Sequence, residues 1–285
     1  MRSIIGNEKV VISLVLLAMV LFALLPLRPP RIWLYPLLRD MAQAKLDWQA
    51  RDMAVYETEH FRIKYTAADE DTVIMVAQAA EAAYRPVTAA LGVEPRGKTL
   101  LLVYPDRREM NQVFGWSGDQ SAMGVYWGGV IQLLSPHGWL QAGESTAEFI
   151  RSGPMVHEFT HLVFDHMTNG NYSRWFTEGL AQYVEYKTSG YEWLTNTNRK
   201  PGSLYSQADL DGDFDNLPDQ SLAYRASLTA IRYIAEVYGE QKLQEVMQRM
   251  QQGQSCKAAI ADSLELDYEQ FGNKWRQWAV SSNKQ

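Results

Sequence analysis

Residues 157–161 read His-Glu-Phe-Thr-His, and Glu178 follows the second histidine after seventeen positions. Residues four apart on an α-helix project from one face, so His157 and His161 are expected to present their rings one above the other. Two imidazoles in this arrangement suit two corners of a tetrahedral zinc site. Glu158 lies one step round the helix, where it can reach a water on the open side of the ion, which is the position of a general base.

The segment around the motif favours a buried helix. Residues 154–165 (PMVHEFTHLVFD) are mostly apolar, and Pro154 stands near the start, where its missing N–H does not weaken a helix. Two histidines and a glutamate on such a helix carry a large desolvation penalty unless something pairs them, and a metal ion does so. The alternative is a pair of hydrogen-bonded core histidines with an ion-paired glutamate.

A second helix is predicted to supply the third ligand. Apolar residues recur every four positions from Phe176 to Val184, which predicts a helix over 174–187 with Glu178 beside the apolar stripe. Gly179 has no side chain, so we expect it to let the backbones of the two motif helices approach closely enough for Glu178 to reach the ion.

In these two segments the chain resembles a known family. The run HEFTH, followed by RWFTEGLA at 174–181, is similar to the gluzincin metallopeptidases, and most closely to the peptidase MA-like group with its HE-x-TH and WF-x-EG elements. The resemblance implies that His157, His161 and Glu178 bind one Zn²⁺ per chain. It also implies a zinc-dependent peptidase in which Glu158, as general base, activates a metal-bound water that hydrolyses peptide bonds.

The resemblance extends from about Tyr56 to the C-terminus and implies an α+β fold. We expect a small mixed N-terminal β-sheet with helices, then a mainly helical C-terminal part, with the active site between them. Gln182 departs from the family pattern, because related enzymes carry an acidic residue one turn after the third ligand. This leaves open which residue supports a histidine ring.

An oxyanion formed during hydrolysis needs a hydrogen-bond donor, and the position of Tyr224 after the third ligand resembles that of a gluzincin tyrosine. Tyr126, Tyr183 and His166 are alternatives for this role. Asp165, one turn after the second motif histidine, is a candidate acceptor for an imidazole N–H.

The segments before the motif alternate between strand and helix patterns. In order, we expect a strand near 59–65, a helix from Glu70 to Leu91 that stops at Gly92, a buried strand over 99–104, a short helix over 106–114 and a hairpin over 123–134. In gluzincins an extended peptide adds to a strand edge beside the active-site helix. Val125 to Trp127 or Val130 to Leu133 is the candidate edge, although an ordinary glycine-bearing hairpin fits the pattern equally well.

The segment from Ser189 to Gln220 is long and polar, and we expect it to frame or cover the site. Within it, residues 209–215 (DLDGDFD) are similar to a calcium loop. Gly212 is fourth in this loop instead of sixth, and the twelfth position is Gln220 instead of a glutamate, so a solvated acidic turn is the preferred interpretation.

The composition fits a globular domain. The chain has 285 residues, 46% of them hydrophobic, which is enough for a sizeable core. A net charge of −6 and the lack of a basic cluster argue against nucleic acid as a partner. Cys256 is the only cysteine, so the chain has no internal disulfide.

The N-terminal segment is predicted to enter a membrane. Residues 10–25 are apolar except for Ser13, and the run reaches eighteen positions at Leu27, just enough to span a hydrocarbon layer about 30 Å thick. We expect a head over 1–9 and an uncleaved transmembrane anchor over 10–27. A signal segment is the alternative, but the small-residue cleavage pattern is missing.

Residues 28–55 are expected to be a juxtamembrane linker, with a short helix at the membrane surface, and residues 56–285 the catalytic domain. Positive charges on the two sides of the anchor are nearly balanced and favour export of the C-terminal part slightly less than its retention. Family habit favours export. We therefore expect a single-pass protein of the cell membrane whose catalytic domain lies outside the cytoplasm and acts on peptides or proteins.

Two other functions remain open. One is a catalytically silent, metal-stabilised interaction module at the membrane, and the other is a zinc hydrolase that uses the same ligands on an ester. Zinc binding alone does not require Glu158, so its presence favours catalysis.

Overall fold

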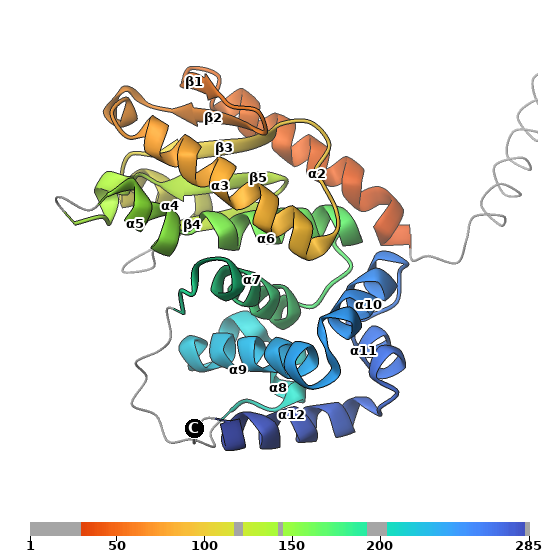
Figure 1. Cartoon of the computed structure of the whole chain (residues 1–285). Coiled ribbons are helices and arrows are strands. Elements are labelled where there is room, and N and C mark those ends of the chain that lie inside the picture. Colours follow the sequence, from red (N-terminus) through yellow and green to blue (C-terminus); the bar gives the residue numbers. More distant parts are fainter. Residues whose placement is uncertain (1–29, 117–121, 142–144, 193–203, 283–285) are drawn as a thin grey trace, which may run out of the picture.

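The computed structural model describes residues 30–116, 122–141, 145–192 and 204–282. The elements in chain order are α2 (Pro30–Gln49), β1 (Ala54–Glu57), β2 (Phe61–Tyr65), η1 (Ala67–Asp69), α3 (Val73–Leu91), β3 (Thr99–Tyr104), α4 (Arg107–Phe114), β4 (Gly124–Trp127), β5 (Val130–Leu134), η2 (Pro136–Gly138), α5 (Thr146–Ser152), α6 (Met155–Thr168), α7 (Arg174–Ser189), α8 (Gln207–Asp211), η3 (Phe214–Asn216), α9 (Gln220–Tyr233), the π-helical turn η4 (Ile234–Tyr238), α10 (Glu240–Gln251), α11 (Cys256–Leu264) and α12 (Tyr268–Ser282). Figure 1 shows a sheet surrounded by helices above a second group of helices, α7 to α12. This is the α+β arrangement expected from the sequence.

The sheet has five strands in the order β1-β2-β3-β5-β4. The three inner strands are parallel, while β1 and β4 are antiparallel edge strands. Successive side chains of a strand point to opposite faces, so β3 divides its residues between two cores. Leu101 and Val103 join the main core with α3 and α6. Leu100 and Leu102 instead pack with Leu46 of α2 on the other face.

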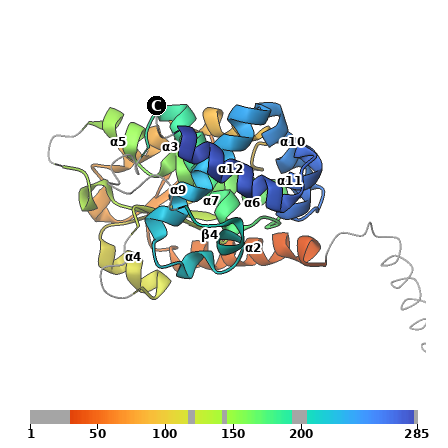
Figure 2. The ribbon, with the colours of Figure 1, turned by 90° about the horizontal axis from the view of Figure 1, so that it is seen from below.

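Helix α2 covers this second face of the sheet. Leu46 and Ala50 are buried there, and the Lys64 ammonium on β2 lies 2.5 Å from the Asp47 carboxylate. Figure 2 shows α2 along one side of the molecule beside β4. The described part of the predicted linker, 28–55, therefore packs as a helix on the sheet, followed by strand β1.

The predicted head, 1–9, and the predicted anchor, 10–27, lie outside the described residues. Among the helices of the described ranges, none combines the length and the apolar character needed to cross a bilayer.

The elements predicted before the motif are confirmed in type and order. Helix α3 ends at Gly92, which adopts a φ of 70° as a left-handed C-cap. Helix α4 begins after Asp106, whose side chain accepts a hydrogen bond from the backbone N–H of Glu109. The hairpin forms from β4 and β5, with the turn at Gly128 and Gly129, both at positive φ.

Gly179 has a different purpose from the one predicted. A Cβ atom added to this residue would lie 2.3 Å from the backbone oxygen of Ser227 on α9. The glycine therefore allows α7 to approach α9, and the expectation that it serves the contact between the two motif helices is wrong.

Replacing Gly179 by alanine is expected to lower the free energy of unfolding by roughly 1–3 kcal/mol, because two helix backbones must separate to admit one methyl group. Urea denaturation measures this loss. Gly272→Ala is the matched control within a helix, since its added Cβ would meet only the Gln207 side chain, at 3.0 Å. An equal loss in both variants would contradict the role given to Gly179.

Candidate metal centre

Helix α6 presents the two motif histidines from one face. It starts directly after Pro154 and ends at Asn169, which is in the left-handed conformation with a φ of 52°. The ring centroids of His157 and His161 are 4.8 Å apart, and the ring planes cross at 78°. The predicted helix and its histidine face are both present.

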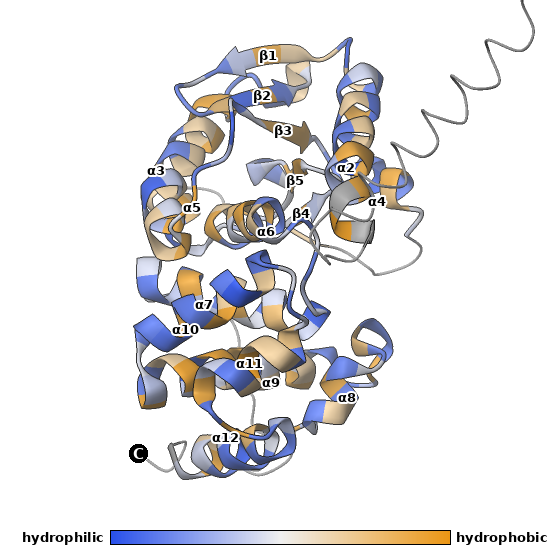
Figure 3. Cartoon of the chain, turned by 90° about the vertical axis from the view of Figure 1, so that its right-hand side faces the viewer, coloured by the Kyte–Doolittle hydropathy of each residue, from blue (hydrophilic) through white to orange (hydrophobic). Residues whose placement is uncertain are grey.

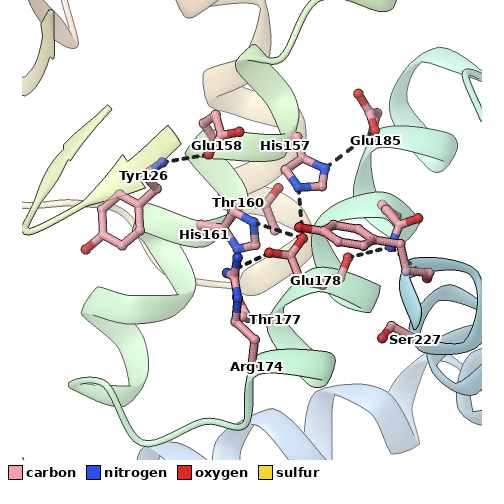
Figure 4. A network of polar contacts seen from close by, with 12 residues as sticks. Tyr126, His157, Glu158, Thr160, His161, Arg174, Thr177, Glu178, Glu185 and Ser227 are labelled. Carbon is pink, nitrogen blue, oxygen red and sulfur yellow. Dashed lines mark hydrogen bonds and ion pairs between the residues drawn. The ribbon is translucent and has the colours of Figure 1, made fainter. Parts of the chain in front are cut away.

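Helix α7 brings Glu178 to these rings. The Glu178 Oε2 atom lies 3.3 Å from His157 Nε2 and 3.6 Å from His161 Nε2 (Figure 4). The three possible ligand atoms all lie within 4.8 Å of one another. Zinc binds imidazole nitrogens and carboxylate oxygens at about 2.0–2.2 Å, so a single ion between these atoms needs only small shifts. This His-His-Glu group fits a metal site.

The atoms of these three side chains that face away from the proposed ion, namely the Nδ1 atoms of the two histidines and Oε1 of Glu178, also have partners. His161 Nδ1 lies 2.7 Å from the hydroxyl oxygen of Thr177, and His157 Nδ1 lies 3.6 Å from Glu185 Oε2. Arg174 approaches the second oxygen of Glu178 at 2.6 Å. Contacts of this kind hold ring and carboxylate orientations in metal sites.

The sequence did not lead us to Thr177 or Glu185, although a signal for both is present. Thr177 precedes Glu178 directly, and Glu185 follows Glu178 by seven positions, which is two helical turns on the same face. Gln182, at the position where the family pattern has an acid, donates instead to the backbone oxygens of Glu178 and Tyr224. The carboxylate beside His157 is therefore one turn further along α7 than in that pattern.

The charges around Glu178 keep it ionised. Burial by itself would raise the pKa of this carboxyl group, but the adjacent His161 and His157 rings and the Arg174 guanidinium outweigh burial and hold the pKa well below its usual range. An anionic oxygen facing two imidazoles is the form that a divalent cation binds.

Glu158 is buried and lies beside the metal group. Its Oε2 accepts a hydrogen bond of 2.7 Å from the backbone N–H of Tyr126 on β4 (Figure 4). Burial raises the pKa of Glu158 above its usual value. A carboxylate with a raised pKa is a better proton acceptor than an exposed one.

Two adjoining cavities meet at this group. One, of about 450 Å³, extends toward α2, and its lining includes Tyr35, Leu38 and Arg39 together with the three possible ligands. The other, of about 700 Å³, extends toward α5 and the start of α9. Both are lined by His157 and Glu158, so together they form a cleft that runs past the metal group.

Tyr224, the predicted oxyanion donor, comes from α9 and lines both cavities. Burial raises the pKa of its hydroxyl group, and the negative charge of Glu178 adds to the shift. The hydroxyl therefore stays protonated, as a hydrogen-bond donor must be.

The three alternatives to Tyr224 have other surroundings. The Tyr183 hydroxyl donates a hydrogen bond of 2.6 Å to Glu240 of α10, and the Tyr126 hydroxyl donates one of 2.7 Å to Asp165. His166 lines neither cavity, and burial lowers its pKa to about 4. Tyr224 is the one residue of the four that lines both cavities, which favours it as the oxyanion donor.

Asp165 does not support a histidine ring, contrary to the prediction. Its carboxylate is fully buried and accepts hydrogen bonds from the hydroxyl groups of Tyr35, Tyr126 and Tyr172 at 2.6, 2.7 and 2.9 Å. Arg39 adds an ion pair at 3.1 Å. The group joins α2, β4 and the segment before α7 to the metal-site helix.

Of the two candidate substrate edges, only one lies at an edge of the sheet. Strand β4 is the edge of the sheet beside α6, and it contains Val125 to Trp127. Strand β5, with Val130 to Leu133, lies between β3 and β4 and is completely buried, so no peptide can add to it.

The four aspartates of the acidic segment 209–215 are exposed, as expected of a solvated acidic turn, and Asp209 and Asp211 also have structural partners. Asp209 forms a capping box with Ser206 at the start of α8. Asp211 accepts hydrogen bonds from the Trp175 indole and the Tyr268 hydroxyl at 2.8 Å. The predicted frame of the site, from Ser189 to Gln220, is described only in part, because residues 193–203 lie outside the described ranges.

Comparison with known proteins finds one family model that matches part of the chain. Residues 143–281 match the family model described as the Peptidase MA superfamily. The match includes both sequence motifs and covers just under half of the chain, and it supports the expected likeness to metallopeptidases of the gluzincin type. A search of curated proteins found no match.

Solved structures provide three further comparisons. The chain is similar to Legionella pneumophila aminopeptidase A in complex with aspartic acid, with 11% identity, a TM-score of 0.49 and coverage of 79% of this chain and 27% of that chain. It is similar to a mutant two-domain M1 zinc metallopeptidase bound to L-arginine, with 14% identity, a TM-score of 0.49 and coverage of 79% and 51%. It is also similar to a mutant M1 zinc metallopeptidase from Deinococcus radiodurans, with 12% identity, a TM-score of 0.42 and coverage of 78% of this chain and 50% of that chain. The chain spans about half of these proteins or less.

Proposed function

We propose that the protein is a zinc-dependent peptidase whose ion is held by His157, His161 and Glu178. The observation that carries this proposal is the convergence of three ligand atoms within 4.8 Å, beside a buried carboxylate, in an open cleft. A metal-stabilised module that cuts nothing needs neither Glu158 nor the cleft.

Each residue has a defined task in the proposed reaction. A zinc ion bound here would lower the pKa of a water molecule and polarise the carbonyl group of the substrate. Glu158 accepts the proton of the attacking water and passes it to the leaving amine. Tyr224 donates a hydrogen bond to the developing oxyanion. The outer edge of β4 holds the peptide as an added strand, which places a backbone amide next to Glu158.

Metal removal tests this function. We expect about one zinc ion per chain and cleavage of a mixed peptide library that stops when a chelator removes the ion and returns when zinc is added. Metal content, by atomic absorption, and library products, by mass spectrometry, are measured on the same samples. Undiminished cleavage by protein shown to be free of metal would contradict the proposal, and cleavage of ester substrates alone would favour an esterase.

Glu185→Gln is expected to weaken zinc affinity by about 10–100-fold, because the anionic oxygen 3.6 Å from His157 Nδ1 favours the ring orientation that binds metal. Competition with a chromophoric chelator measures the affinity. Glu245→Gln, on α10 in an ion pair with Arg249, is the control and should bind zinc as the unaltered protein does. Equal affinities for both variants would mean that Glu185 does not position His157.

We also propose that residues 10–27 anchor the protein in the cell membrane, with the catalytic domain outside the cytoplasm. This proposal is supported by the apolar run in the sequence. Protease accessibility in intact cells compared with lysed cells tests it, because a domain inside the cytoplasm is digested only after lysis.

A further inference from the structure

Helix α2 has an exposed apolar face on the side away from the domain. Five large apolar side chains on this helix are each between 58% and 65% exposed, and we call them the outer face of α2: Leu34, Leu37, Leu38, Met41 and Trp48. Their spacings of three, four, seven and fourteen residues from Leu34 place them on one side of a helix. Figure 3 shows hydrophobic residues along α2 at the outside of the domain.

The opposite face of α2 is firmly attached to the domain. Tyr35 and Arg39 contact the buried Asp165 carboxylate, and Leu46 and Ala50 are buried against the sheet. The helix therefore has apolar residues on two opposite sides, but within the described ranges only the inner side is covered. A large contiguous apolar patch on the surface of a protein marks an interaction site.

The apolar surface continues beyond the outer face. A groove of about 650 Å³ lies between α2 and α4, and its lining includes the apolar residues Met53, Val113, Phe114 and Trp127. Trp127 and Val113 are themselves about half exposed. An interface on this side would thus extend from α2 to the end of strand β4.

The chain that leads into α2 indicates what covers this face. Residues 10–25 are apolar except for Ser13, and Leu27 is only seven residues before Leu34. Even fully extended, seven residues span about 25 Å. If residues 10–27 enter a bilayer, the outer face of α2 begins close to the lipid surface. Exposed leucines, methionine and tryptophan on a helix held there have the composition of an interfacial amphipathic helix.

We propose that the outer face of α2 rests on the surface of a lipid bilayer. Leu38 of the outer face lines the cleft together with Tyr35 and Arg39 of the inner side, so the cleft then opens beside the bilayer. Peptide segments that emerge from the membrane, or lie on it, would be the first to reach the metal group. The contact with lipid itself does not rest on the proposed peptidase activity.

Site-specific labelling of the full chain tests this contact. Met41→Cys places a thiol on the outer face, and Ile74→Cys, on α3, is the matched control at another exposed apolar position. The native Cys256 is buried, and burial raises the pKa of its thiol to about 12, so it reacts slowly with the label. Each variant carries a fluorescent label and is incorporated into vesicles of phosphatidylcholine and phosphatidylglycerol, with or without bromine on the lipid chains.

We expect brominated lipid to quench the label at position 41 several-fold more strongly than the label at position 74. Adding Leu37→Gln should weaken the lipid contact at position 41 by roughly tenfold, because a buried leucine side chain contributes about that factor. Equal quenching at the two positions would overturn the proposal. A label at position 41 that is shielded from water, but not quenched, would also overturn it, because protein such as residues 10–27 or a second copy would then cover the face.

Discussion

Replacing Glu158 by glutamine is expected to lower the rate of peptide hydrolysis by about 10²–10⁴-fold while zinc remains bound. The loss follows from chemistry, since glutamine cannot accept a proton from the attacking water, and general-base catalysis contributes a factor of this size. The fold should not change. The amide oxygen of glutamine has the same reach and can still accept the hydrogen bond from the Tyr126 backbone N–H.

Three measurements separate this prediction from a loss of structure. The variant should contain as much zinc as the unaltered protein, should unfold at about the same urea concentration, and should show its loss in kcat rather than in binding of peptides. Glu185→Gln is the useful comparison, because its defect should disappear at saturating zinc. If Glu158→Gln and the unaltered protein process a peptide library identically at equal zinc content, the assignment of the general base is wrong.

The metal group could be predicted from the sequence because its geometry is mostly local. His157 and His161 belong to one helix, whose 3.6-residue period fixes their relative direction without any tertiary information. The prediction that Glu178 lies beside these histidines needed one further assumption, namely that the next helix packs alongside the first. The short turn between Thr168 and Arg174 leaves little freedom in that step.

The partners of these residues could be predicted less well because they depend on contacts between distant segments. Asp165 was expected to face a histidine, yet its hydrogen-bond donors Tyr35 and Arg39 precede it by 130 and 126 positions. Nothing in the spacing around Asp165 indicates them. Gly179 shows the same limit, since its contact with Ser227 joins two helices whose approach has no local signature.

Helix α2 was assigned to a linker for a related reason. Its apolar residues lie on two opposite sides, so the sequence lacks the single stripe by which a packed helix is recognised. The helix also accommodates Pro36 in its interior. The inner side of this helix is recognisable only once Asp165 and the face of the sheet are in place.

Replacing Asp165 by asparagine is expected to lower the free energy of unfolding by roughly 3–5 kcal/mol, because one partner of a buried ion pair is removed. The carboxylate satisfies three tyrosine hydroxyls and the Arg39 guanidinium. Asparagine offers a single acceptor oxygen, and its amide N–H groups would face donors instead of acceptors. At least one hydroxyl would lose its acceptor, and the buried Arg39 charge would keep only the exposed Asp40 carboxylate, 3.9 Å away, as a counter-ion.

Urea denaturation measures this loss, and Asp40→Asn is the matched control. Asp40 lies 3.9 Å from the same arginine, but its side chain is 69% exposed, so its removal should change the stability by no more than about 1 kcal/mol. Because Asp165 joins α2 and β4 to the metal-site helix, Asp165→Asn should also speed amide hydrogen exchange in α2 before the protein unfolds as a whole. Similar stabilities for the two variants, with slow exchange in α2, would mean that the tyrosine and arginine contacts do not hold this wall of the cleft in place.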